Sequence, residues 1–180
     1  MPDNRLLLHT CCAPCAIACV QSLTDENFDV TSFWMNPNIH PYTEYQSRRE
    51  TLISYAQSIG LPLVVQGEYG LRPFLQAIGQ RFDERCGTCY ALRMNAAAQY
   101  AAGNGFDAFS TTLLISPYQN HELLVQTAKA AAAKAGVTFL YRDFRPLFRQ
   151  GQAQARARAL YMQKYCGCIF SEEDRYRKST

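Results

Sequence analysis

Short apolar runs alternate along this chain with longer stretches that have helical periodicity. The runs cover residues 5–10, 30–35, 63–66, 108–114 and 138–141. Strands that alternate with helices predict an α/β fold with a doubly wound, mostly parallel sheet. Ligands bind such sheets beyond the carboxyl ends of the strands, so a functional site is expected at that edge.

The predicted helices lie between and after these strands. In one of them apolar residues recur at helical spacing from Tyr42 to Ile59, and Gly60 is expected to end it. Ser116 to Gln119 form a capping box that is expected to open another helix, which ends at Gly136. The remaining helices are predicted at 14–23, 89–100 and 151–165.

The 180 residues fit one domain, and we expect a single α/β domain over 1–180 with a basic helical C-terminal part. Hydrophobic residues make up 48% and charged residues 18%, which is a globular composition. The polar start at Met1 to Asn4 lacks the basic region of a signal peptide. The apolar stretch 11–20 is about half the ~20 residues of a membrane span. We therefore expect a cytoplasmic protein without membrane contact.

The charge is unevenly distributed. Residues 142–180 hold nine Lys or Arg and four acids, which gives +5, whereas the preceding residues carry −2. Such a basic segment indicates either an anionic partner or a solvated helical face, and charge alone favours the solvated face.

The eight cysteines fall into three clusters. The clusters are Cys11, Cys12, Cys15 and Cys19; Cys86 and Cys89; and Cys166 and Cys168. In the reducing cytosol, clustered thiols bind metal or perform redox chemistry more often than they form structural disulfides. Thiolates are the soft ligands that iron–sulfur clusters and zinc prefer.

The position of each cluster predicts its role. Cys86 and Cys89 open a helix whose N-terminus favours the thiolate, and Cys11 and Cys12 follow the first strand, so both pairs are predicted metal ligands. Cys15 and Cys19 lie one helical turn apart, and either buried structural thiols or site thiols fit this spacing.

The Cys166-Gly167-Cys168 spacing is too tight for a relaxed disulfide. It favours redox exchange, with metal ligation as the alternative.

The sequence has no GxxxxGK[ST] and no GxGxxG motif. The first strand-to-helix turn, where such sheets often bind phosphate, instead carries the residues from His9 to Cys15. A soft-metal site is therefore expected at the usual phosphate position.

Motifs along nearly the whole chain resemble those of the cobalamin-independent epoxyqueuosine reductases, the QueH family. They lie at 7–15, 36–41, 85–90, 109–119, 143–145 and 163–168, and include Leu-His-Thr-Cys-Cys-Ala-Pro-Cys, Arg-Cys-Gly-Thr-Cys-Tyr and Lys-Tyr-Cys-Gly-Cys. The resemblance implies an adenine-nucleotide-hydrolase-like (HUP, Rossmann-like) fold. The implied reaction reduces epoxyqueuosine to queuosine in tRNA, the last step of queuosine biosynthesis, with electrons from an unidentified donor.

The resemblance also implies a [4Fe–4S] cluster. Its ligands would be Cys11, Cys12, Cys86 and Cys89, while Cys166 and Cys168 would be a redox-active pair. It further implies an additional mononuclear iron held partly by an aspartate, for which Asp143 is the candidate because it follows a predicted strand. An ordinary salt bridge with Arg145 is the alternative.

The tRNA would meet the basic segment. The expected phosphate contacts are Arg156, Arg158, Lys164, Arg175 and Arg177. His9 and His121, at predicted element ends, could supply protons or be structural, and His40 is expected in a loop or against substrate.

Two other functions are open. One is a zinc-stabilised tRNA-binding module without catalysis. The other is an ATP-dependent tRNA-thiolating enzyme, which needs a Ser-Gly-Gly phosphate loop after the first strand, where this chain has Thr10-Cys11-Cys12.

Overall fold

The computed structural model describes residues 4–177, so Lys178 of the basic segment and the first three residues of the polar start lie outside the described residues. The core is one sheet in the order β3-β2-β1-β4-β5, and each neighbouring pair of strands is parallel. The strands are β1 (Arg5–His9), β2 (Asp29–Trp34), β3 (Leu63–Val65), β4 (Ala108–Thr111) and β5 (Thr138–Phe139). The predicted doubly wound sheet is confirmed.

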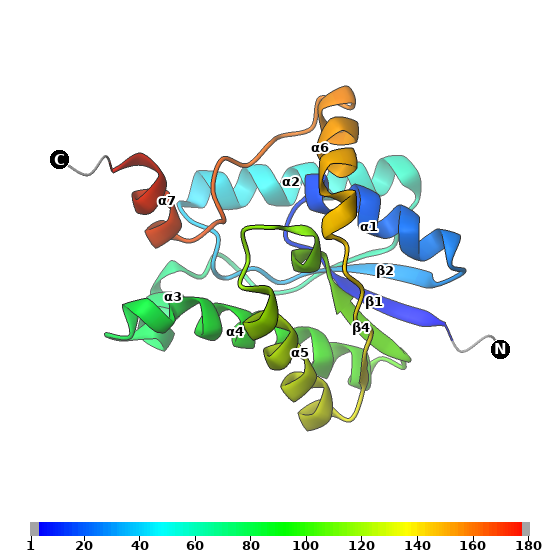
Figure 1. Ribbon diagram of the computed structural model, residues 1–180, viewed down its shortest axis with the longest axis horizontal. Coiled ribbons are helices and arrows are strands. Elements are labelled where there is room, and N and C mark those ends of the chain that lie inside the picture. The colour runs from blue at the N-terminus through cyan, green and yellow to red at the C-terminus, as the bar shows by residue number, and fades with distance from the viewer. Residues whose placement is uncertain (1–3, 178–180) are drawn as a thin grey trace.

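Helices cover both faces of the sheet. The helices are α1 (Ala13–Asp25), α2 (Tyr42–Ile59), α3 (Leu71–Ile78), α4 (Arg85–Gly103), α5 (His121–Ala135), α6 (Phe148–Ala157) and α7 (Ile169–Tyr176). Figure 1 shows α1, α2 and α6 on one face and α4 and α5 on the other. Across the described part of the chain, no helix has the length and apolar character needed to cross a bilayer.

The central strand β1 has both faces covered, and Leu6, Leu7 and Leu8 are completely buried. Leu7 pairs with Thr31 of β2 on one side and with Phe109 of β4 on the other. A continuous apolar run, without polar alternation, is what a strand buried on both faces requires. The strand order reverses at β1 and β4, which makes the carboxyl ends of these two strands the expected binding edge.

Several helix ends follow from local sequence, as predicted. Pro14 lies in the first turn of α1, where its missing N–H has no partner to lose. Gly60 and Gly136 adopt left-handed conformations, with φ of 66° and 71°, and end α2 and α5.

Two predicted boundaries after β4 are wrong. The strand stops at Thr111, whose side chain accepts a hydrogen bond from the Leu113 backbone N–H and begins the 3-10 turn Thr112–Ile115. Helix α5 starts at His121 instead of after Ser116, because Asn120 caps it through the Leu123 N–H. Two residues with good capping side chains compete here, and the later one caps the helix.

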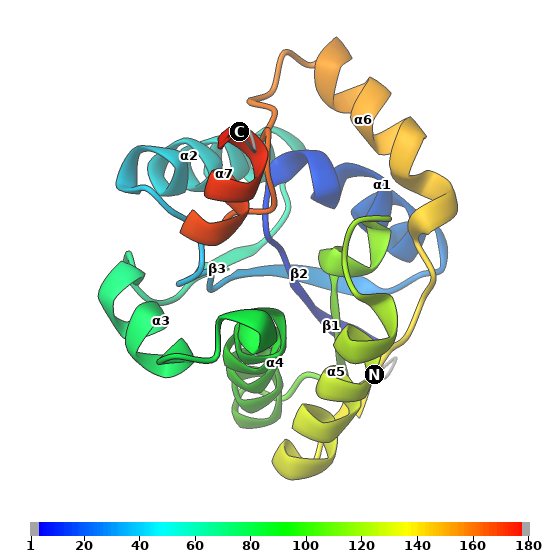
Figure 2. The same ribbon diagram turned by 60° about the vertical axis from the view of Figure 1, so that its left-hand side comes forward.

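The C-terminal segment also differs from the prediction. Helix α6 ends at Ala157 rather than near residue 165, and α3 and α7 were not expected. Residues 158–168 instead run as an irregular segment with turns and bends toward α7, which lies beside α2 (Figure 2). Arg48 of α2 donates hydrogen bonds of 2.9 Å to the carbonyl oxygens of Tyr165 and Cys166. These tertiary bonds replace the helical bonds that the carbonyls would otherwise make.

Candidate metal and redox site

Three buried cysteines meet where β1 passes into α1. The Sγ atoms of Cys11, Cys12 and Cys15 all lie within 4.8 Å of one another, and we call them the sulfur triad. Cys12 is the N-cap of α1 and Cys15 lies in its first turn, so helix geometry brings their side chains together. A set of soft donors this close can hold a metal ion.

The triad lies at the point where the strand order reverses. The Cys11 backbone N–H donates to Thr112 Oγ1 at 3.2 Å, and Cys11 Sγ lies 3.5 Å from the same oxygen. Thr112 follows β4, so this contact joins the ends of the two strands that flank the switch point. The sulfur triad is therefore in the position where related sheets bind phosphate.

Crowding of the triad perturbs its thiols in opposite directions. Hydrogen bonding with Cys12 lowers the pKa of the Cys11 thiol. Burial raises the pKa of Cys12, and hydrogen bonding with Cys11 raises that of Cys15. Negative charge is therefore easier to place on Cys11 than on Cys12 or Cys15.

The other two cysteine motifs form a second thiol group, made of Cys86, Cys89, Cys166 and Cys168. Cys86 and Cys89 lie in the first turn of α4, as predicted. Cys89 and Cys168 are buried in one small apolar cluster, whereas Cys86 and Cys166 are exposed. Burial raises the pKa of Cys89 to about 12, and negative charge on Cys166 and Cys168 contributes to this rise. The four thiols are therefore close enough to influence one another.

The turn that carries Cys166 and Cys168 is held tightly against α2. Gly167 has a φ of 147°, and a Cβ there would come within 3.3 Å of Arg48 Nη1. Glycine is favoured because other residues rarely adopt this conformation and a Cβ would crowd Arg48. Arg48 itself is buried and pairs with Glu44 at 2.7 Å.

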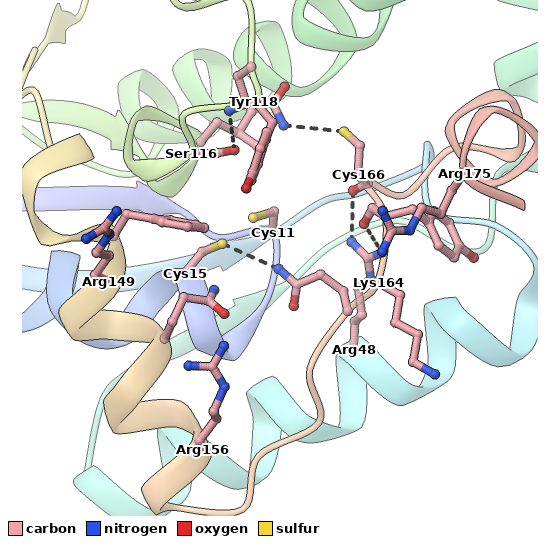
Figure 3. Close-up of a pocket in the computed structure, with 16 residues that line it drawn as sticks. Cys11, Cys15, Arg48, Ser116, Tyr118, Arg149, Arg156, Lys164, Cys166 and Arg175 are labelled. Carbon is pink, nitrogen blue, oxygen red and sulfur yellow. Dashed lines mark hydrogen bonds between the residues drawn. The ribbon is translucent and has the colours of Figure 1, made fainter.

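A cavity of about 860 Å³ opens over the triad (Figure 3). Cys11, Cys15 and Cys166 line it, so thiols of both the sulfur triad and the second thiol group border the same cavity. Gln163 donates from Nε2 to Cys12 Sγ at 2.9 Å and so fixes one wall. Tyr118, which is 85% exposed, offers an aromatic ring at another. A volume of this size is in the range of small-ligand sites.

Basic side chains surround the cavity. They are Arg48, Arg149, Arg156, Lys164 and Arg175. Of the five expected phosphate contacts, Arg156, Lys164 and Arg175 are here. The other two lie elsewhere: Arg158 packs over the Tyr55 ring at 5.8 Å, and Arg177 pairs with Glu173 at 2.6 Å.

The histidines have structural partners. Buried His9 contacts Thr111 Oγ1 at 3.0 Å, and burial lowers its pKa to about 4, so it is neutral at physiological pH. His40 is also buried and accepts from the Ile169 N–H, which fixes the start of α7. His121 contacts the Tyr141 hydroxyl at 3.0 Å on the surface.

Asp143 is exposed and forms a bidentate ion pair with Arg145, with distances of 2.8 and 2.7 Å. The Arg145 side chain lowers the pKa of Asp143 to about 2, so the carboxylate is ionised. Arg142, expected to assist, pairs with Glu26 instead. Among the described residues that line the cavity, Asp143 is absent. Its role as an iron ligand stays a prediction.

Sequence reasoning missed two residues of the site, Arg48 and Arg93, and left the role of Cys15 open. The sequence contains a motif that indicates Cys15, because Cys12 and Cys15 form a CxxC at a helix start just as Cys86 and Cys89 do. Arg93 lies four residues after Cys89 and therefore on the same helix face. Arg48 gave no such signal, since its burial depends on its contacts with a segment more than a hundred residues away.

A doubly wound α/β domain with a buried thiol triad at its switch point and a second thiol group at a nearby helix start defines a metal-binding or thiol-redox protein. The family described as epoxyqueuosine reductase QueH matches residues 6–174. The chain belongs to this family, and the predicted resemblance is confirmed.

Curated relatives match nearly the full length of this chain. The epoxyqueuosine reductase QueH of Dehalococcoides mccartyi is 37% identical over 174 residues, covering 97% of this chain and 96% of the relative. That of Thermotoga maritima is 34% identical over 185 residues, covering 97% and 94%. That of Haemophilus influenzae is 32% identical and covers 100% and 78%.

Proposed function

We propose that this protein is a cytoplasmic oxidoreductase that reduces epoxyqueuosine to queuosine in tRNA. The observation that carries the proposal is the cavity over the switch point, which combines thiols of both groups with a rim of basic side chains. Family membership supports the reaction, since the curated relatives are named epoxyqueuosine reductases. Eight free cysteines support a reducing compartment.

The donor set fits an iron–sulfur centre. We propose that Cys11, Cys12, Cys86 and Cys89 hold a [4Fe–4S] cluster, which would supply single electrons. The close approach of the triad sulfurs supports this assignment on one side. On the other side, negative charge at both Cys89 and Cys11 raises the pKa of Arg93, which supports a shared environment for the two ligand pairs.

Removal of the epoxide oxygen as water consumes two electrons and two protons. Oxidation of two thiols to a disulfide releases the same number of each, so a Cys166–Cys168 pair balances the reaction. Cys166 lines the cavity and accepts a hydrogen bond from Gln119 at 3.3 Å. An external reductant must then restore the dithiol after each turnover.

The deciding experiment is anaerobic reconstitution with iron and sulfide, followed by assay on tRNA that carries epoxyqueuosine. The expected result is a brown protein that converts the tRNA-bound epoxide to queuosine. Colourless protein with stoichiometric zinc and no turnover would sink the proposal and favour a zinc-stabilised binding module.

Binding of tRNA is expected to weaken steeply with salt, because the basic rim would release counterions from phosphates. Arg156→Gln, Lys164→Gln and Arg175→Gln should each lower the slope of log K against log salt by about 0.7 to 0.9. The measurement is a binding titration at several ionic strengths. Arg158→Gln and Arg177→Gln are matched controls outside the cavity and should leave the slope unchanged. If the control variants lower the slope as much as the cavity variants do, the tRNA binds another face of the protein.

Replacing Asp143 by asparagine tests the proposed further iron. A carboxylate is a hard ligand suited to a mononuclear iron. If Asp143 is a ligand, the variant should keep the cluster chromophore and lose about one iron atom. Turnover should fall about a hundredfold, equal to about 2.7 kcal/mol of transition-state stabilisation. Arg145→Gln is the control, because it removes only the ion pair. Near-normal iron content and activity in both variants would leave Asp143 as a surface ion-pair partner.

A further inference from the structure

Arg93 of α4 is a buried cation without a carboxylate. Its side chain is 1% exposed. Nη2 donates to Cys89 Sγ at 3.0 Å, and Nε donates to the Cys89 carbonyl oxygen at 3.3 Å. Within residues 4–177, no Asp or Glu oxygen lies within ion-pair distance of this guanidinium.

The other deeply buried arginine has the carboxylate partner that Arg93 lacks. Arg48 is 2% exposed and pairs with Glu44 at 2.7 Å. An unpaired charge in the protein interior is strongly unfavourable, so buried charges are normally paired or bind a charged ligand. Arg93 therefore requires an anion that the protein's carboxylates do not provide.

The groups around Arg93 identify that anion. The Arg93 Cζ lies 5.9 Å from the centre of the Tyr90 ring, which offers only weak stabilisation. The ionisable group that Arg93 contacts is the Cys89 thiol, whose Sγ lies 3.0 Å from Nη2. A thiol becomes anionic when it binds a metal, because ligation displaces its proton. An iron–sulfur centre with thiolate ligands has a net negative charge that would complete the pair.

We propose that Arg93 is the counter-ion of the metal–thiolate centre, and that it raises the reduction potential of that centre. The inference rests on the proposed function, since it takes Cys89 as a ligand. Reduction adds one negative charge, which a guanidinium stabilises strongly at hydrogen-bond distance in a low-dielectric interior. Arg93 is thus a positioning and tuning residue that acts through Cys89.

The test compares Arg93→Met, which removes the charge at similar length, with Arg93→Lys, which keeps it. Both reconstituted proteins are titrated with dithionite, and the reduced cluster is followed by electron paramagnetic resonance. Arg93→Met should lower the equilibrium constant for one-electron reduction at least tenfold, which corresponds to about 59 mV. Arg93→Lys should stay within threefold of the unmodified protein. Arg85→Met is a matched control, because Arg85 adjoins Cys86 but already pairs with Asp174 at 2.7 Å. It too should stay within threefold.

Thermal unfolding gives a second readout that a merely structural role would not produce. In metal-free protein, Arg93→Met removes an unpaired buried charge, so its unfolding midpoint should equal or exceed that of the unmodified chain. In the reconstituted protein the order should reverse, because the variant lacks the cation that balances the centre. If Arg93→Met takes up no iron, the unfolding midpoints of the two metal-free proteins still test the inference.

Two results would overturn the inference. One is an unchanged potential in fully loaded Arg93→Met. The other is an equal loss of thermal stability with and without metal, which would make Arg93 an ordinary packing residue. Failure of the proposed function looks different: the unmodified protein itself would form no iron–sulfur chromophore.

Discussion

Replacing Cys89 by serine is expected to abolish the visible iron–sulfur absorption and all measurable reduction of epoxyqueuosine. Serine oxygen is a hard and weakly acidic donor that substitutes poorly for a thiolate. The site cannot recruit water as a substitute ligand easily, because Cys89 is buried against Phe74 and Ile78. Cys89→Ser should also leave Arg93 without the sulfur that it contacts. The measurement is iron and sulfide content together with the absorption spectrum after anaerobic reconstitution.

Cys19→Ser is the matched control for this substitution. Cys19 is fully buried in the main core, and burial raises its thiol pKa, yet its sulfur lies outside the sulfur triad. Both variants place a hydroxyl in an apolar environment and should lose about 1–3 kcal/mol of stability through desolvation. Only Cys89→Ser should lose the metal. Full iron and sulfide content in Cys89→Ser would remove Cys89 from the ligand set.

Replacing either Cys166 or Cys168 by serine is expected to leave the cluster absorption in place and to reduce turnover at least tenfold. A single remaining thiol cannot form the disulfide that releases two electrons and two protons. The fold should survive at both positions. Cys166 is exposed, and Cys168 is the N-cap of α7, where its sulfur accepts from the Ser171 N–H at 3.4 Å. Serine is a preferred residue at an N-cap, so α7 should still form.

The double variant distinguishes a redox pair from two independent residues. If the two thiols act as a unit, Cys166→Ser with Cys168→Ser should lose no more activity than either single change. Steady-state turnover and iron content are measured for all three proteins. Loss of iron from either single variant would instead assign that cysteine to the metal. That outcome would require a new division of the second thiol group, since Cys168 packs with Cys89.

Local sequence was sufficient for most of the fold. The fully apolar run of β1 predicts a strand covered on both faces, and the structure confirms it. Pro14, Gly60 and Gly136 each act through their own backbone geometry, so the start of α1 and the ends of α2 and α5 could be read directly. Boundaries were wrong where two local signals competed, as at Ser116 and Asn120.

The sequence also showed which helix or strand each thiol belongs to or follows. It did not show which thiols lie together in the structure. It located Cys11 and Cys12 after the first strand and Cys86 and Cys89 at a helix start, because these positions depend on a few neighbouring residues. Cys15 could have been added from the CxxC that it forms with Cys12.

By itself, then, the sequence determined the parallel α/β fold, the edge that carries the site and the chemistry of its donors. Each depends on a short apolar run, on a helical period of 3.6 residues, on a cap or on a residue type, which are all short-range properties. Only the tertiary structure decided that Arg48 and Arg93 are buried and that residues 158–168 leave the helix to close the cavity. These features come from contacts such as Arg48 with Cys166, 118 positions apart, and Cys11 with Thr112, 101 positions apart. The burial of Arg48 depends on a segment that lies far away in the sequence, and no local pattern encodes that contact.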